Sequence, residues 1–114
     1  MKLLIAGSRS IKSFDLTPYI PTCTGLIISG GADGIDTVAE RFADKMRKSK
    51  LIIRPDYALY GRSAPLKRNE VMVNLADQVL VIWDGKSRGT KYTIDYAKKI
   101  GKAIKVIEVN KYLS

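Results

Sequence analysis

Residues 25–36 read GLIISGGADGID, from Gly25 to Asp36, and join an apolar run directly to a glycine-rich turn. Apolar residues then recur at spacings of three and four, which is the period of an α-helix with one buried face. These apolar positions are Ile35, Val38, Ala39, Phe42 and Met46. The stretch therefore predicts a buried strand, a tight turn and a helix, which is the repeating unit of an α/β fold.

Four further apolar runs indicate strands on either side of this unit. The first four strands along the chain are almost continuous in Leu, Ile and Val, as expected for parallel strands covered on both faces, whereas the last alternates and is expected at an edge. With helices between them, they predict a single Rossmann-like α/β domain over residues 1–114. We expect a mostly parallel five-stranded sheet in the order 3-2-1-4-5, with helices on both faces. The predicted strands are Lys2–Ala6, Gly25–Ser29, Leu51–Arg54, Gln78–Trp83 and Ala103–Val109.

Two more helices are predicted after the one that starts at Ile35. One begins near Pro65, a residue suited to a first helical turn. The other begins near Thr90 as its N-cap and is ended by Gly101. A short helix is also expected in Asp15–Ile20. The expected buried residues are Leu66, Met72 and Leu75 in the first of these helices, and Ile94, Ala97 and Ile100 in the second.

The composition is that of an ordinary globular domain with an excess of positive charge. Hydrophobic residues make up 46%, and 20 Lys+Arg against 11 Asp+Glu give a net charge of +9. Such a charge favours polyanionic partners, including nucleic acid, although well-spread lysines also fit a solvated surface. The chain has one cysteine, Cys23, and no histidine, so we expect no metal site and no His-based triad. Without a bilayer-spanning apolar run or a signal-peptide layout, the sequence predicts a cytoplasmic protein with no membrane contact.

Glycine, hydroxyl and arginine residues cluster where the predicted strands end. In open α/β sheets the ligand crevice lies beyond the carboxyl ends of the strands. Glycines let the backbone approach an anion closely, and free N–H groups at a helix start attract a phosphate. We therefore expect a site for a phosphate-bearing, nucleotide-like ligand. Its expected residues are Gly7, Ser8, Arg9, Ser29, Gly30, Gly31, Asp33, Asp36, Arg68, Asn69, Trp83, Ser87, Arg88, Gly89 and Thr90.

The loop from Ser87 to Thr90 is expected to hold the phosphate through hydroxyl groups and a bidentate contact from Arg88. Arg68, at a helix start that faces the same edge, is expected to be a second cation. The alternative is that the loop only turns the chain and caps a helix, and that Arg68 belongs to a solvated basic turn. Tyr57, Tyr60 and Trp83 are candidate stacking surfaces for a base, and half-buried packing is the alternative for Trp83.

Asp33 and Asp36 lie at the start of the helix that follows the second strand. Two carboxylates there would repel a phosphate placed directly on that helix end. Asp36 is expected either to cap the helix or to hold a ribose hydroxyl or a nearby arginine. No Walker lysine motif occurs, and the glycines lack the G-x-G-x-x-G spacing, so we expect no dinucleotide cofactor and no other cofactor.

Several of these segments together resemble the SLOG superfamily over about residues 2 to 108. This superfamily includes the Lonely Guy phosphoribohydrolases, the DNA-processing protein A (Smf) family and small stand-alone Rossmann-like proteins thought to bind nucleotide-derived ligands. The chain is most similar to the small stand-alone members. The matching segments are Ile5-Ala6-Gly7-Ser8-Arg9, Ser29–Asp36, Lys67-Arg68-Asn69 with Met72, and Ala76-Asp77 leading to Gly89-Thr90.

The resemblance implies three functions, of which we favour binding of a nucleotide or ADP-ribose-like ligand without turnover. The first alternative is hydrolysis of the N-glycosidic bond of a nucleoside 5′-monophosphate, as in the Lonely Guy branch. Arg68 and Met72 match that branch, but Thr93 stands where its catalytic glutamate is expected. An enzyme would then depend on Arg68 together with Glu70 or Asp95. The second alternative is binding of single-stranded DNA, as in the DNA-processing branch.

A homodimer is a further expectation, because related folds commonly pair through helices. Tyr92 and Tyr96 lie one turn apart on the predicted third helix and form the face that we expect to join two copies. Packing of the two rings on the surface of one copy is the alternative.

Overall fold

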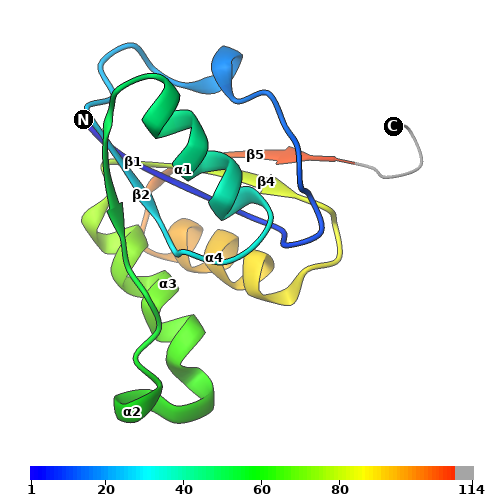
Figure 1. Ribbon diagram of the computed structural model, residues 1–114. Helices are drawn as coiled ribbons and strands as arrows, with labels where there is room; N and C mark the ends of the chain where they lie inside the picture. Colours follow the sequence, from blue (N-terminus) through cyan, green and yellow to red (C-terminus); the bar gives the residue numbers. More distant parts are fainter. Residues whose placement is uncertain (110–114) are drawn as a thin grey trace.

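The computed structural model describes residues 1–109, which form one five-stranded sheet with helices on both faces (Figure 1). All strand pairs are parallel, and the order is β3-β2-β1-β4-β5, so the predicted topology is confirmed. The strands are β1 (Lys2–Gly7), β2 (Leu26–Ser29), β3 (Ser49–Ile52), β4 (Gln78–Trp83) and β5 (Ala103–Glu108). The helices are α1 (Ile35–Lys45), α2 (Tyr57–Tyr60), α3 (Ala64–Leu75) and α4 (Arg88–Lys99), with 3-10 turns η1 (Thr17–Tyr19) and η2 (Gly61–Ser63).

Alternation along the central strand β1 divides the core into two layers. Leu3 and Ile5 pack with α1 on one face of the sheet, whereas Leu4 and Ala6 pack with α3 and α4 on the other. Successive side chains of a strand point to opposite faces, so an apolar run without interruption fills both layers. This is why β1, β2 and β4 have the continuous Leu, Ile and Val pattern that predicted them.

The third strand corrects one expectation. β3 begins at Ser49, two residues before the predicted start at Leu51, and its side chains are exposed or half-buried. Leu51 itself is 41% exposed, so this strand is not covered on both faces. As an edge strand it pairs only with β2 in the sheet order, and Lys50 forms an ion pair with Asp44 of α1 instead of a core contact.

The helices follow the predicted pattern with shifted ends. α4 begins at Arg88 with Ser87 in the N-cap position, so Thr90 is a buried residue inside the first turn and not the N-cap. Gly101 adopts a φ of +74° just beyond α4, which confirms it as the helix-ending glycine. Leu75 and Ile100 were expected in the core but lie exposed at or just past the ends of their helices. None of the helices within residues 1–109 has the length and apolar character to span a bilayer.

Candidate functional site

A cavity of about 430 Å³ opens at the carboxyl edge of the sheet, where β1 and β4 end and α1, α3 and α4 begin nearby. This volume lies in the range typical of small-molecule sites. Predicted site residues in its wall are Gly7, Arg9, Asp36, Arg68, Asn69, Ser87, Gly89 and Thr90. Wall residues that were not among the expected ligand-binding residues are Ala6, Ser10, Ala32, Pro65, Leu66, Met72 and Asp84, together with Thr93, which was noted only for the glutamate that it replaces.

Arg68 is the buried cation of this cavity, with only 8% of its surface exposed. Its Nη1 donates to the main-chain carbonyls of Gly30 at 2.5 Å and Ile53 at 3.4 Å, and its Nε donates to Oδ1 of Asn69 at 2.8 Å. The side chain therefore ties α3 to the loops after β2 and β3. The interpretation of Arg68 as part of a solvated basic turn is wrong.

Asp36 lies beside Arg68 and is equally buried. Its Oδ2 accepts a hydrogen bond from the N–H of Ala32 at 3.1 Å, so the carboxylate closes the glycine loop instead of capping its own helix. Burial raises the pKa of Asp36 to about 6, against the lowering effects of the Ala32 N–H and the Arg68 charge. Asp36 is thus a carboxyl group in the cavity wall that changes charge near neutral pH.

Asp84 is a second carboxylate in the wall, and it organises the loop between β4 and α4. Its Oδ1 accepts from the N–H groups of Lys86 and Ser87, both at 2.8 Å, and its Oδ2 accepts from the Ser10 hydroxyl at 2.7 Å. Burial alone would raise the pKa of Asp84, but these donors and the Ser8 hydroxyl outweigh it and lower the pKa. The signal in the sequence was the position of Asp84 directly after a buried strand.

Arg9 is the accessible cation in the wall. It is exposed, and within residues 1–109 it makes no hydrogen bond or ion pair. It is close enough to Asp36 to act on that carboxyl electrostatically. An arginine without a partner at the rim of a cavity is free to bind an anionic group of a ligand.

The first turn of α4 adds main-chain donors to the same wall. Across the described residues, the N–H groups of Arg88, Gly89 and Thr90 have no hydrogen-bond acceptor, as is usual for a helix start. The hydroxyl groups of Ser87 and Thr90 lie 3.0 Å apart and hydrogen-bond to each other. Thr93 is buried one turn further on and donates its hydroxyl hydrogen to the Gly89 carbonyl.

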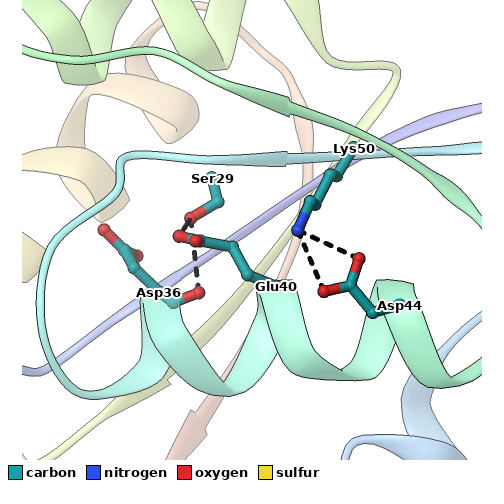
Figure 2. Close-up of polar contacts among 5 residues, drawn as sticks. All are labelled: Ser29, Asp36, Glu40, Asp44 and Lys50. Carbon is teal, nitrogen blue, oxygen red and sulfur yellow. Dashed lines mark hydrogen bonds and ion pairs between the residues drawn. The ribbon is translucent and has the colours of Figure 1, made fainter.

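Two predicted ligand-binding serines are structural. Ser8 is fully buried, and its Oγ accepts the N–H of Asp84 at 3.0 Å. Ser29 is also fully buried, and Figure 2 shows its hydroxyl between the main-chain carbonyl of Asp36, at 3.4 Å, and the carboxylate of Glu40, at 2.9 Å. Both serines satisfy polar groups next to the cavity and lie behind its wall.

The other predicted ligand-binding residues also lie outside the wall. The space where a Cβ of Gly30 would stand is filled by Arg68, and Gly31 is covered by Arg54. Trp83 is half-buried against the core and donates its indole N–H to the Ser87 carbonyl, which supports the packing interpretation. Asp33 and Arg88 have exposed side chains that do not contribute to the cavity.

The acidic residues proposed as substitutes for a catalytic glutamate lie outside the cavity wall. Glu70 accepts a short hydrogen bond from the Tyr92 hydroxyl, which joins α3 to α4. Asp95 is exposed and forms an ion pair with Lys91 at 2.8 Å. Tyr96 likewise accepts a hydrogen bond from Asn74 of α3, so both tyrosines of the expected dimer face are engaged within one copy.

Comparison with known proteins gives one informative relative. The Gene 61 protein of Mycobacterium phage D29 is 34% identical over 118 aligned positions, which cover 88% of this chain and 90% of the phage protein. The chain belongs to the family of this Gene 61 protein. The similarity therefore extends over most of both proteins and is not confined to the glycine loop. No family model and no solved structure matches the chain.

Proposed function

We propose that the chain binds a nucleotide or nucleotide-derived ligand, such as one with a phosphoribosyl or ADP-ribose-like group, in the cavity at the carboxyl edge of the sheet, without turnover. The observation that carries this proposal is that one cavity wall contains both cationic or N–H donor groups and carboxylates. The donors are Arg9, Arg68 and the start of α4, and the carboxylates are Asp36 and Asp84. A phosphorylated sugar has the matching pair of features, an anionic group and several hydroxyl donors.

The phosphate is expected to lie at Arg9. Its guanidinium has no competing partner within the described residues, and the unbonded N–H groups at the start of α4 add a favourable dipole. Arg68 supports the same charge from the floor, although two of its nitrogens already donate to the protein. Charge-assisted hydrogen bonds of this kind are the strong ones in phosphate recognition.

The ribose is expected to lie toward Asp36. A carboxylate accepts hydrogen bonds and donates none when ionised, so it suits sugar hydroxyls and repels a phosphate. Asp84 is less available, because both of its oxygens already accept hydrogen bonds from the protein. This division of the wall orients the ligand with its phosphate toward Arg9.

Binding without turnover is proposed because the groups named for hydrolysis are committed elsewhere. Thr93 lacks a carboxylate, and its hydroxyl is held by the Gly89 carbonyl. Neither Glu70 nor Asp95 lines the cavity. Stabilising an oxocarbenium-like state or activating water at the position of Thr93 would need a carboxyl group there. The two carboxyl groups of the wall, Asp36 and Asp84, come from other segments and accept main-chain N–H groups of their own loops.

Calorimetry with AMP and adenosine tests the proposal. We expect AMP to bind and adenosine to bind about tenfold more weakly or worse, because only AMP has the charged group for Arg9. Arg9→Ala should weaken the binding of AMP. Its charge-matched control is Arg41→Ala, which removes an exposed arginine of α1 outside this cavity and should leave AMP binding unchanged. Equal affinities for AMP and adenosine, or no binding of either, would contradict the proposal. Release of free adenine on prolonged incubation would contradict its claim of no turnover.

A further inference from the structure

A short arm stands out from the sheet next to the cavity. It consists of α2 and η2, at the bottom of the view in Figure 1. Tyr57 is 60% exposed, Leu59 67% and Tyr60 44%, so the arm presents aromatic and apolar side chains to solvent. Exposed large apolar groups that lie together commonly mark a binding surface.

The arm has a defined conformation of its own. Asp56 caps it, since its Oδ1 accepts the N–H of Leu59 at 3.0 Å and its carbonyl accepts the N–H of Tyr60 at 3.0 Å. At the other end, the Ser63 hydroxyl donates to the Tyr60 carbonyl at 2.8 Å. The aromatic side chains therefore stand on a hydrogen-bonded turn, which limits the entropy lost when a ligand stacks on them.

The arm is continuous with the cavity wall. η2 runs directly into α3, where Pro65, Leu66 and Arg68 line the cavity. Tyr57 at the start of the arm lies close enough to Arg68 to interact with it electrostatically. Tyr57 is the first residue of α2, and α2 packs against α3, so the arm lies against the helix whose first turn lines the cavity.

Positive charge surrounds the arm. Arg62 and Lys67 are exposed, and within the described part of the chain they have no hydrogen bond or ion pair. Arg54, just before the arm, has an exposed guanidinium that reaches the Gly31 carbonyl at 3.5 Å. This charge opposes the pairing of two copies through the arm and favours an aromatic ligand that carries negative charge.

We propose that Tyr57 forms a stacking face for the nucleobase of a ligand whose phosphate occupies the cavity, and this inference rests on the proposed function. The exposed ring offers a flat, rigid surface on an arm that packs against α3, and base–aromatic stacking tolerates any base because each has a π-face. Of the three aromatic residues that the sequence offers as stacking surfaces, Trp83 packs on the core and donates its indole N–H to the Ser87 carbonyl. The arm, rather than the end of β4, therefore supplies the aromatic contact.

The test compares AMP with ribose 5-phosphate, which has the same phosphate and sugar but no base. By calorimetry, Tyr57→Ala should lower the affinity for AMP about tenfold and leave the affinity for ribose 5-phosphate unchanged. Tyr57→Phe should keep the affinity for AMP, because the ring is retained. Leu59→Ala on the same arm is the matched control for loss of an exposed side chain. Sedimentation of each variant reports whether the arm joins two copies.

Each outcome has a distinct meaning. Wild-type binding of both ligands with equal affinity, and no effect of Tyr57→Ala, would overturn the stacking role and leave the proposed function intact. Equal weakening of both ligands would overturn it as well, because the tyrosine would then act on the phosphate side. A dimer that dissociates in Tyr57→Ala while AMP affinity is unchanged would assign the arm to contact between copies instead. Failure of the wild type to bind either ligand would remove the proposed function and the inference with it.

Discussion

Arg68 on α3 donates a hydrogen bond of 2.5 Å to the carbonyl of Gly30, a residue 38 positions earlier at the end of β2. The contact holds the glycine loop against α3 and fixes one wall of the cavity before any ligand is present. Since the guanidinium is buried and shared with Ile53 and Asn69, its role is partly structural. Preorganisation of this kind lowers the entropy lost on binding.

Replacement of Gly30 by alanine should strain this contact. A Cβ at this position would stand 2.7 Å from Arg68 Nη1 and 2.9 Å from Asp36 Oδ2, so the buried side chains would have to move. We expect the free energy of unfolding in urea to fall by about 1–3 kcal/mol, the usual scale for overpacking. Gly25→Ala is the control, since a Cβ there meets nothing within 4 Å. Equal stabilities of the two variants would mean that the loop accommodates the methyl group without cost.

The two exposed arginines near the start of α4 should differ in their effect on AMP binding. Arg9 lines the cavity and lacks a partner among the described residues. Arg9→Ala should therefore make the binding free energy of AMP less favourable by about 1.5–3 kcal/mol, as for the loss of a charge-assisted hydrogen bond. Arg88 lies outside the wall, and Arg88→Ala should cost less than about 0.5 kcal/mol, the scale of a neutral surface change. A larger loss from Arg88→Ala would place the phosphate over the outer end of α4, as the sequence alone suggested.

The contrast between these arginines shows where sequence reasoning reaches its limit. Continuous apolar runs in β1, β2 and β4 predict the parallel sheet, because burial on both faces needs such runs. Topology then brings the glycine loops to one edge, which is how Arg9, Arg68 and Asp36 could be named in advance. The direction of a side chain on a loop or on the first turn of a helix follows from tertiary packing instead. Arg9 and Arg88 both follow the end of a buried strand, and the sequence favoured Arg88 for the phosphate, but Arg9 is the one that lines the cavity.

Burial should decide which polar contact of α1 matters for stability (Figure 2). Ser29 is fully buried and hydrogen-bonds to Glu40, so Ser29→Ala should lower the free energy of unfolding by about 1–3 kcal/mol through unpaired buried groups. Lys50 and Asp44 form a surface ion pair with side chains 36% and 63% exposed, and Lys50→Ala should cost less than about 1 kcal/mol. Chemical denaturation of both variants at the same pH measures the difference. A larger loss from Lys50→Ala would contradict this ranking.

Asp36 should make stability fall as the pH rises toward neutrality. Burial raises its pKa from 3.8 to about 6, so between these values the folded protein holds a proton that the unfolded chain releases. Its contribution is fully present below about pH 4 and is lost as the pH rises through about 6, which amounts to up to about 3 kcal/mol. Asp84 has a lowered pKa and acts in the opposite sense, because its contribution is lost as the pH falls. The difference between wild type and Asp36→Asn separates the two carboxyl groups.

The amide introduced by Asp36→Asn would resemble the protonated carboxyl and could still accept the N–H of Ala32. We therefore expect this variant to match the wild type near pH 4 and to exceed it in stability by up to about 3 kcal/mol above pH 7. Urea denaturation across this range gives the difference at each pH, and the exposed Asp33→Asn is the control that should follow the wild type. A constant difference at all pH values would show that Asp36 does not titrate in this range. The buried charge beside Arg68 would then be stabilised in the folded protein at every pH tested.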